Sequence, residues 1–235
     1  MPTIEAPLPA AQSGVKVAAK QLTTIVVRTT SIEVLIGGPY KGRDGEMHTY
    51  GHAALRVVGP NDERVYDFGR YGDVTGDFGA EGEGILRVWT SFSSYIASEN
   101  SYGRTTAGFT YNIGADKAQA INAYYDQLIA GAAPRRSKHP NMKEYKLARN
   151  YHGLSNNCTT LTLAGARIAL PDIDADAAKH NIGRGLSSVE KMAARAKNFG
   201  SWPRQIFMPA DTKAMLEAAK PLKADQTKTY GPSTK

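Results

Sequence analysis

The chain contains one cysteine, Cys158, among its 235 residues. A single thiol cannot form an intrachain disulfide, so the fold is expected to be stable without one. No apolar run approaches the ~20 residues that a membrane-spanning helix needs, and we expect no stable insertion into a bilayer. Residues 1–20 lack the basic and apolar regions of a secretory signal peptide. We therefore expect synthesis in the cytoplasm and, for action elsewhere, export by a specialised secretion system.

The overall composition is ordinary for a globular protein, with 41% hydrophobic and 22% charged residues. The net charge is +7, which favours anionic partners. Nucleic acid, anionic lipid, bacterial wall polymers and an acidic inhibitor protein all fit this charge. Charge alone does not choose among them.

Several motifs of catalysis and binding are also missing. The sequence has no HExxH pattern for zinc hydrolysis and no G-x-S-x-G elbow for a serine hydrolase. The carboxylates of the glycine-rich stretch 69–84 do not match a calcium-binding EF-hand loop, and we interpret this stretch as a flap over a site. No basic-aromatic motif of a nucleic-acid-binding module is present. We expect no metal, no cofactor and no nucleic-acid partner.

The length suits one domain. We expect a flexible segment at 1–20, a single domain at 21–219 and a disordered tail at 220–235, where apolar residues are scarce. Strands are predicted at 23–29, 32–36, 52–58, 63–68, 85–90 and 108–113. Helices are predicted at 116–130, 158–170, 187–200 and 211–220. Antiparallel strands with separate helices indicate an α+β fold, and we expect a monomer.

The stretch YGHAAL begins a predicted hairpin whose loop is 59–62. That loop pairs Val58 with Glu63 and Ala54 with Asp67, which puts Asp67 diagonal to His52 on one face of the sheet. A carboxylate there could orient the imidazole as in a catalytic triad. A loop one residue longer or shorter would move Asp67 to the other face. The alternative is a strand-end histidine of structural role beside an exposed aspartate.

The stretch NNCTTL begins a predicted helix, with Asn157 or Asn156 as its N-cap. Cys158 then lies in the first turn, where free backbone N–H groups and the helix dipole favour the nucleophilic thiolate. The same N–H groups could stabilise an oxyanion. Gly165 weakens the helix prediction because glycine is a poor helix former. The alternative interpretation of Cys158 is a small buried hydrophobe.

Together, GHAAL, VYDFG and NNCTT resemble the circularly permuted branch of the NlpC-type papain-like superfamily, which includes the YiiX-like and lecithin:retinol acyltransferase groups. In that branch a strand-start histidine comes first, a polar residue on the next strand follows, and a helix-start cysteine comes last. The resemblance covers roughly 50–170 and implies a papain-like antiparallel sheet packed against helices. It implies His52, Asp67 and Cys158 as the catalytic residues. Tyr50 and Asn157 are the alternatives for the third role and the candidates for oxyanion or other support.

The resemblance implies a cysteine peptidase or amidase that cleaves cell-wall peptidoglycan through a thioester. The basic segment 135–149 could flank the cleft, and we expect Arg135, Arg136 and Lys138 to bind substrate. His152, close before Cys158, is the rival base. Without a signal peptide, such an enzyme fits a toxin effector delivered to rival cells, for example by type VI secretion, with a cognate immunity protein. Two alternatives stay open: a lipid-directed acyltransferase or thioesterase, and a non-enzymatic basic binding module.

Overall fold

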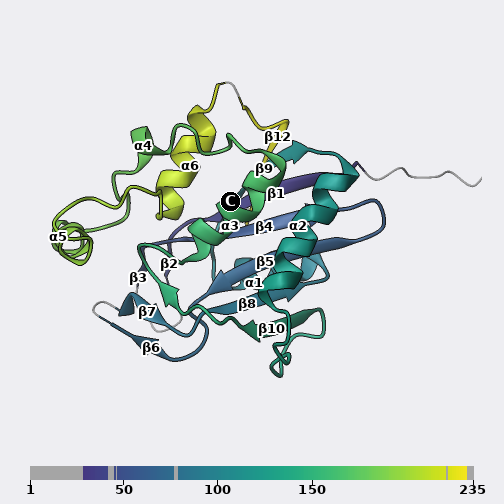
Figure 1. Ribbon diagram of the computed structural model, residues 1–235, viewed down its shortest axis with the longest axis horizontal. Helices are drawn as coiled ribbons and strands as arrows, with labels where there is room; N and C mark the ends of the chain where they lie inside the picture. Colours follow the sequence, from purple (N-terminus) through teal and green to yellow (C-terminus); the bar gives the residue numbers. More distant parts are fainter. Residues whose placement is uncertain (1–28, 42–44, 46, 77–78, 221, 232–235) are drawn as a thin grey trace, which may run out of the picture.

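A seven-stranded antiparallel sheet organises the computed structural model, which describes residues 29–41, 45, 47–76, 79–220 and 222–231 (Figure 1). Every pair of neighbouring strands in this sheet runs antiparallel. The strand order is β10 (Met142–Lys146), β8 (Ile85–Trp89), β5 (Glu63–Gly69), β4 (His52–Val58), β1 (Ser31–Gly37), β9 (Thr106–Asn112) and β12 (Gln226–Tyr230). With its separate helices, this sheet confirms the predicted α+β class.

Short strands and helices complete the fold. The remaining strands are β2 (Tyr40–Lys41), β3 (Met47–His48), β6 (Val74–Thr75), β7 (Glu81–Gly82) and β11 (Tyr151–His152). The helices are α1 (Phe92–Ser101), α2 (Ala115–Leu128), α3 (Cys158–Ala169), α4 (Ala177–His180), α5 (Ser188–Lys197) and α6 (Pro209–Ala218). Among the described residues, none of these helices combines the length and apolarity needed to cross a membrane. The predicted flexible segment at 1–20 lies outside the described residues, and so does the predicted strand at 23–29 except for its last residue.

Both faces of the large sheet are covered. Helices α2 and α3 pack on one face and α1 on the other (Figure 1). Along β4, Leu55 and Val57 join the larger apolar cluster under α2 and α3, whereas Ala54 joins the smaller cluster that includes Tyr95 of α1. Because side chains alternate between the faces of a strand, a strand covered on both sides reads as a continuous apolar run. This explains why the central strands could be found from composition.

Gly165 allows α3 to approach its neighbours closely. A Cβ placed there would lie 2.5 Å from the Tyr125 hydroxyl of α2 and 2.9 Å from Leu55 Cδ2 of β4. The same Tyr125 hydroxyl donates a 3.1 Å hydrogen bond to the Leu161 carbonyl of α3. The glycine that weakened the helix prediction is therefore a packing requirement, and it fixes the helix that carries Cys158 against the sheet.

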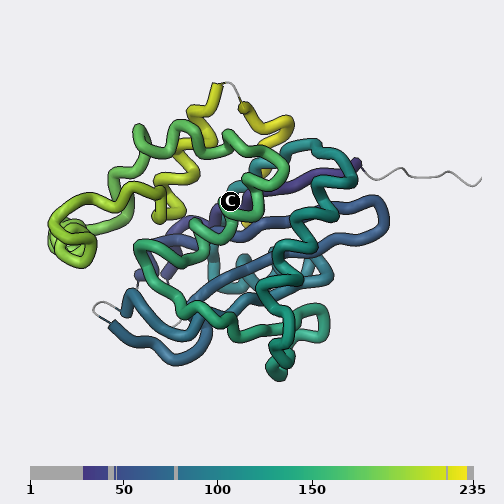
Figure 2. Tube along the Cα trace, in the orientation of Figure 1, coloured from purple at the N-terminus to yellow at the C-terminus, as the bar shows by residue number. Residues whose placement is uncertain are grey.

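The prediction of a disordered tail at 220–235 is wrong for Gln226–Tyr230, which form edge strand β12 beside β9 (Figure 2). The Tyr230 hydroxyl donates a 2.7 Å hydrogen bond to Glu33, and its ring meets Phe92 edge-on at 5.1 Å. An edge strand can be polar because one edge and most of its side chains face solvent. The tail therefore lacks the apolar pattern by which strands are recognised in a sequence.

A capping box of Ser187 and Glu190 begins helix α5, and a strained residue, Phe199, follows its C-cap. The Gly200 N–H donates to the Arg195 carbonyl, which is the Schellman pattern, and Phe199 has a φ of 54° at the position where glycine is usual. The Phe199 side chain is 99% exposed, so nothing in the packing compensates the left-handed backbone.

We expect Phe199→Gly to raise the free energy of unfolding by about 1 kcal/mol, because left-handed backbone costs a non-glycine residue about that much. Denaturant unfolding measures the change. Phe199→Ala is the matched control: it removes the same exposed ring but keeps the strain, so its stability should match that of the wild type. Equal stability of the two variants would show that the strain is not significant.

Candidate active site

The histidine hairpin has the predicted register. Val58 pairs with Glu63 and Ala54 with Asp67, and the Gly59 N–H closes the loop on the Asp62 carbonyl at 2.9 Å. This register brings His52 Nε2 within 2.6 Å of Asp67 Oδ1, with both side chains buried. The predicted contact between His52 and Asp67 is therefore present, and the alternative of an exposed aspartate is excluded.

Two residues that the sequence did not suggest hold Asp67. The Tyr71 hydroxyl donates a 2.7 Å hydrogen bond to Asp67 Oδ1 and lies 3.3 Å from His52 Nε2. The Arg87 guanidinium stacks 3.4 Å from the centre of the Tyr71 ring and is held by Glu144. Burial alone would raise the pKa of Asp67, but the charge and hydrogen bond of His52, with Arg87 and Tyr71, hold it below its usual range. Asp67 is therefore an anion beside the imidazole.

The cysteine helix begins where the sequence indicated. Asn157 is the N-cap: its side chain accepts from the Thr160 N–H, and Thr160 accepts from the Asn157 N–H in return. Cys158 is thus the first helical residue. The Asn157 side-chain amide also donates to the carbonyls of Gly153 and Phe207. Both of its N–H bonds are used, so Asn157 supports the helix start and has no donor left for an oxyanion.

His52 and Cys158, far apart in the sequence, meet through a side-chain hydrogen bond. Since Asp67 occupies Nε2 of His52, the nitrogen that remains for the sulfur is Nδ1. Burial would raise the pKa of the Cys158 thiol, but the hydrogen bond and charge of His52 and the backbone N–H groups of Ala53 and Thr159 lower it. Burial would lower the pKa of His52, but Asp67 and Cys158 raise it to about 10. These interactions favour the thiolate of Cys158 and the imidazolium of His52.

Tyr151, on β11, is a further contact of the sulfur. Its hydroxyl hydrogen-bonds the Cys158 side chain, and burial together with the Cys158 charge raises the pKa of Tyr151 far above its usual range. The phenol therefore stays protonated and donates to the thiolate. His152, the rival base, bonds through Nδ1 to its own turn at Ser155 and turns Nε2 toward Glu81 at 3.9 Å. Its two ring nitrogens are thus engaged away from the sulfur.

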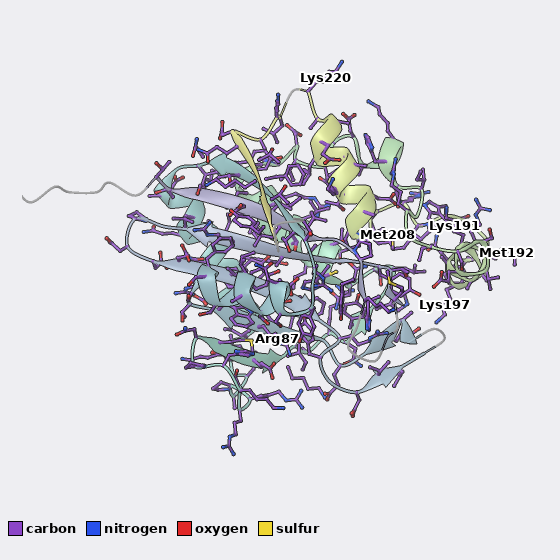
Figure 3. All side chains as sticks on the ribbon, turned by 180° about the vertical axis from the view of Figure 1, so that it is seen from behind. Arg87, Lys191, Met192, Lys197, Met208 and Lys220 are labelled. Atoms are coloured by element: carbon purple, nitrogen blue, oxygen red, sulfur yellow. The ribbon has the colours of Figure 1, made fainter. Side chains whose placement is uncertain are left out.

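The thiol opens into a cavity of about 130 Å³. Its lining comes from the turn before β4, the loop between β6 and β7, the segment before α3, helix α5 and the segment before α6. Most lining side chains are apolar, Leu154, Ala194 and Met208 among them. Two of the lining residues, Lys197 at the end of α5 and Met208 at the start of α6, are labelled in Figure 3. The sulfur is thus accessible from the cavity although the Cys158 residue is only 6% exposed.

Other predicted site residues take different places. Tyr50 lines the cavity, but its hydroxyl bonds Glu190 of α5 and so ties the turn before β4 to that helix. The predicted substrate-binding cations Arg135, Arg136 and Lys138 are not among the residues that line the cavity, and their role stays a prediction. Arg135 is paired with Glu83 at 3.2 Å and bridges to the edge strand β10. A run of positive charge in a sequence does not reveal on which side of the sheet it will lie.

Besides Arg87, three residues of the site escaped the sequence analysis: Tyr71, Tyr151 and Arg70, which lines the cavity. Tyr71 and Arg70 directly follow the strand that carries Asp67, and Tyr151 precedes Cys158 by one short turn. Their nearness to the motifs is the only signal that could have indicated them. In the described part of the chain, no three His, Cys, Asp or Glu side chains gather as metal ligands would. Comparison with protein-family models, curated proteins and solved structures found no match for the chain.

Proposed function

We propose that the chain is a cysteine hydrolase that cleaves amide bonds in the peptides of bacterial peptidoglycan. The observation that carries the proposal is the hydrogen-bonded line from Cys158 through His52 to Asp67, which ends in a cavity at the sulfur. Nucleophile, base and orienting carboxylate in hydrogen-bond contact are the arrangement of nucleophilic acyl transfer. The order of the three residues in the chain supports the likeness to the permuted NlpC-type enzymes and to a papain-like arrangement.

In the first half of the reaction, the Cys158 thiolate attacks the carbonyl carbon and forms a tetrahedral oxyanion. The first-turn N–H of Cys158 has no acceptor within its helix, and the Tyr151 hydroxyl already points at the sulfur. These two donors stabilise the oxyanion. The C–N bond then breaks, and the His52 imidazolium gives its proton to the leaving amine. A thioester remains on Cys158.

In the second half, neutral His52 takes a proton from water, and the resulting hydroxide attacks the thioester carbonyl. The C–S bond breaks, which releases the carboxylic acid and restores the thiolate beside the imidazolium. Asp67, buried and ionised, stabilises the imidazolium formed in this step and fixes the ring so that Nδ1 faces the sulfur. One water is consumed for each bond cleaved.

The net charge of +7 supports an anionic polymer such as the bacterial wall as the substrate. If such an enzyme is delivered into the periplasm of a rival cell, the producing cell needs an immunity protein against it. A second candidate function, a lipid-directed acyltransferase or thioesterase, is favoured by the mostly apolar lining of the cavity. A narrow apolar cavity suits an acyl chain as well as a peptide side chain.

Digestion of purified peptidoglycan tests the proposal. We expect wild-type protein to release fragments whose summed mass exceeds that of the uncleaved peptide by one water for each bond cleaved. Protein alkylated with iodoacetamide is the control and should release none. Acyl release from phospholipid vesicles without wall fragments would favour the second candidate. No product from either substrate would favour a binding module.

A further inference from the structure

Arg70 lies where β5 ends, three residues after Asp67, and lines the cavity together with Cys158. It is half-buried. The structure gives its guanidinium no ion pair among the described residues, whereas the neighbouring cation Arg87 is paired with Glu144. A guanidinium presents several N–H donors in a planar fork that matches a carboxylate. An Arg70 without a counter-ion inside a cavity therefore has its donors available to a ligand.

Two glycines of the stretch 69–84 leave the space that the Arg70 side chain occupies. A Cβ placed at Gly82 would lie 3.1 Å from Arg70 Cγ, and one placed at Gly79 would lie 2.8 Å from the guanidinium nitrogen Nη1. Gly79 has a φ of +59°. A larger residue at either position would clash with the Arg70 side chain and displace it from its place beside β6 and β7. Two of the glycines in this stretch thus serve to direct Arg70, a role different from that of a flexible flap.

The charge of Arg70 acts on the same end of the cavity as the thiolate. Burial raises the pKa of Tyr151, whose hydroxyl bonds Cys158, and the positive charge of Arg70 opposes that rise. Arg70 acts in the same sense on Tyr50, another lining residue. Arg70, Tyr151 and Cys158 line the same cavity. A ligand group bound to Arg70 would therefore lie in the same cavity as the bond under attack.

The other charged groups of the cavity have partners. Lys197 pairs with Glu81 at 2.8 Å, and Glu190 accepts the Tyr50 hydroxyl. Of the two cations that line the cavity, Lys197 and Arg70, only Arg70 has no ion pair among the described residues. One guanidinium matches the charge of a monoanion better than that of a dianionic phosphate.

We infer that Arg70 binds a carboxylate of the substrate next to the scissile carbonyl. The inference rests on the proposed function and narrows its substrate class. The enzyme would act on acyl compounds that carry a free carboxylate close to the bond that breaks. Arg70 would hold that carboxylate through two parallel N–H···O bonds, an interaction that fixes orientation as well as position.

Alkylation of Cys158 by iodoacetate and by iodoacetamide tests this inference without a known substrate. Both reagents transfer their methylene carbon to the sulfur and expel iodide, and they differ in a carboxylate against a neutral amide. We expect the rate ratio of iodoacetate to iodoacetamide to fall about tenfold or more in Arg70→Gln, because a charge-assisted hydrogen bond is lost. Any change in the thiolate fraction affects both rates equally and cancels in the ratio. Mass spectrometry of the modified protein gives the two rates.

Arg70→Lys should keep part of the preference, since its charge remains and the fork is lost. Lys117→Gln, on the exposed outer side of α2, is the matched control for net charge and should leave the ratio unchanged. Equal ratios in the wild type and in Arg70→Gln would overturn the inference. Protection of Cys158 from iodoacetamide by inorganic phosphate at lower concentrations than by acetate would overturn the assignment to a carboxylate. A thiol inert to both reagents would instead refute the proposed hydrolase, so the two failures are distinguishable.

Discussion

Cys158→Ala is expected to lower wall-peptide hydrolysis by about 10⁴-fold or more, since loss of the nucleophile leaves only binding and oxyanion stabilisation. The proposed role of the sulfur rests on its position: it contacts His52 and Tyr151 and opens into the cavity. Fragment release from peptidoglycan, followed by mass over time, measures the loss. Cys158→Ser places a hydroxyl, whose pKa is much higher, at the same position. It should be nearly as inactive, because the contact with His52 that favours a thiolate is too weak to ionise a hydroxyl.

The alanine variant should fold normally, which separates a chemical defect from a structural one. The Cys158 side chain is small, and the start of α3 is held by Asn157 and Thr160 rather than by the thiol. Removal of the sulfur also relieves the cost of a buried charge. Circular dichroism and the thermal midpoint should therefore stay close to those of the wild type. Undiminished fragment release by a folded alanine variant would rule out Cys158 as the nucleophile.

The part of the site that could be predicted from the sequence is the part fixed by local rules. The loop at 59–62 sets the hairpin register, and the register decides that Asp67 and His52 share a face. Likewise, Asn157 as the cap decides that Cys158 is the first helical residue. Each of these inferences uses residues within about fifteen positions of one another. Backbone geometry transmits such relations without knowledge of the rest of the fold.

Relations between distant segments could not be found in this way. Tyr151 and Arg70 act in the site because β11, β7 and β6 form a small sheet beside it, and a strand of two residues leaves almost no pattern in a sequence. The pairing of Arg135 with Glu83, beside the edge strand β10, is likewise a contact between distant segments. Strand β12 required the partner β9 to be recognised at all. Tertiary context decided each of these cases.

Asp67→Asn is expected to reduce kcat by about 10²–10⁴-fold, as loss of the orienting carboxylate does in related catalytic sets. Asparagine has the shape of aspartate, and its oxygen can still accept the hydrogen bond from Tyr71. The positive charge of Arg87 keeps its partner Glu144. The variant should therefore fold. What it loses is the negative charge beside His52, and with it the stabilisation of the imidazolium.

The pH dependence provides the decisive readout for Asp67→Asn. In the wild type, Asp67 and Cys158 together outweigh burial and raise the pKa of His52 from 6.5 to about 10. The imidazolium, and the stability that its interactions contribute, is fully present below pH 6.5 and is lost as the pH rises through about 10. We expect wild-type activity to decline only near that upper value. Without the Asp67 charge, the burial of His52 is opposed by Cys158 alone, so the alkaline decline should move to lower pH.

Tyr71→Phe is the matched control, because it removes a hydrogen bond to Asp67 and leaves the carboxylate charge in place. It should lower activity less than Asp67→Asn and move the alkaline decline by a smaller amount. Rates of fragment release between pH 5 and 11, at saturating substrate, give the two profiles. An Asp67→Asn variant with reduced kcat and an unshifted alkaline decline would show that Asp67 orients His52 without stabilising its charge. An unchanged kcat would remove Asp67 from the catalytic set and leave a two-residue site of Cys158 and His52.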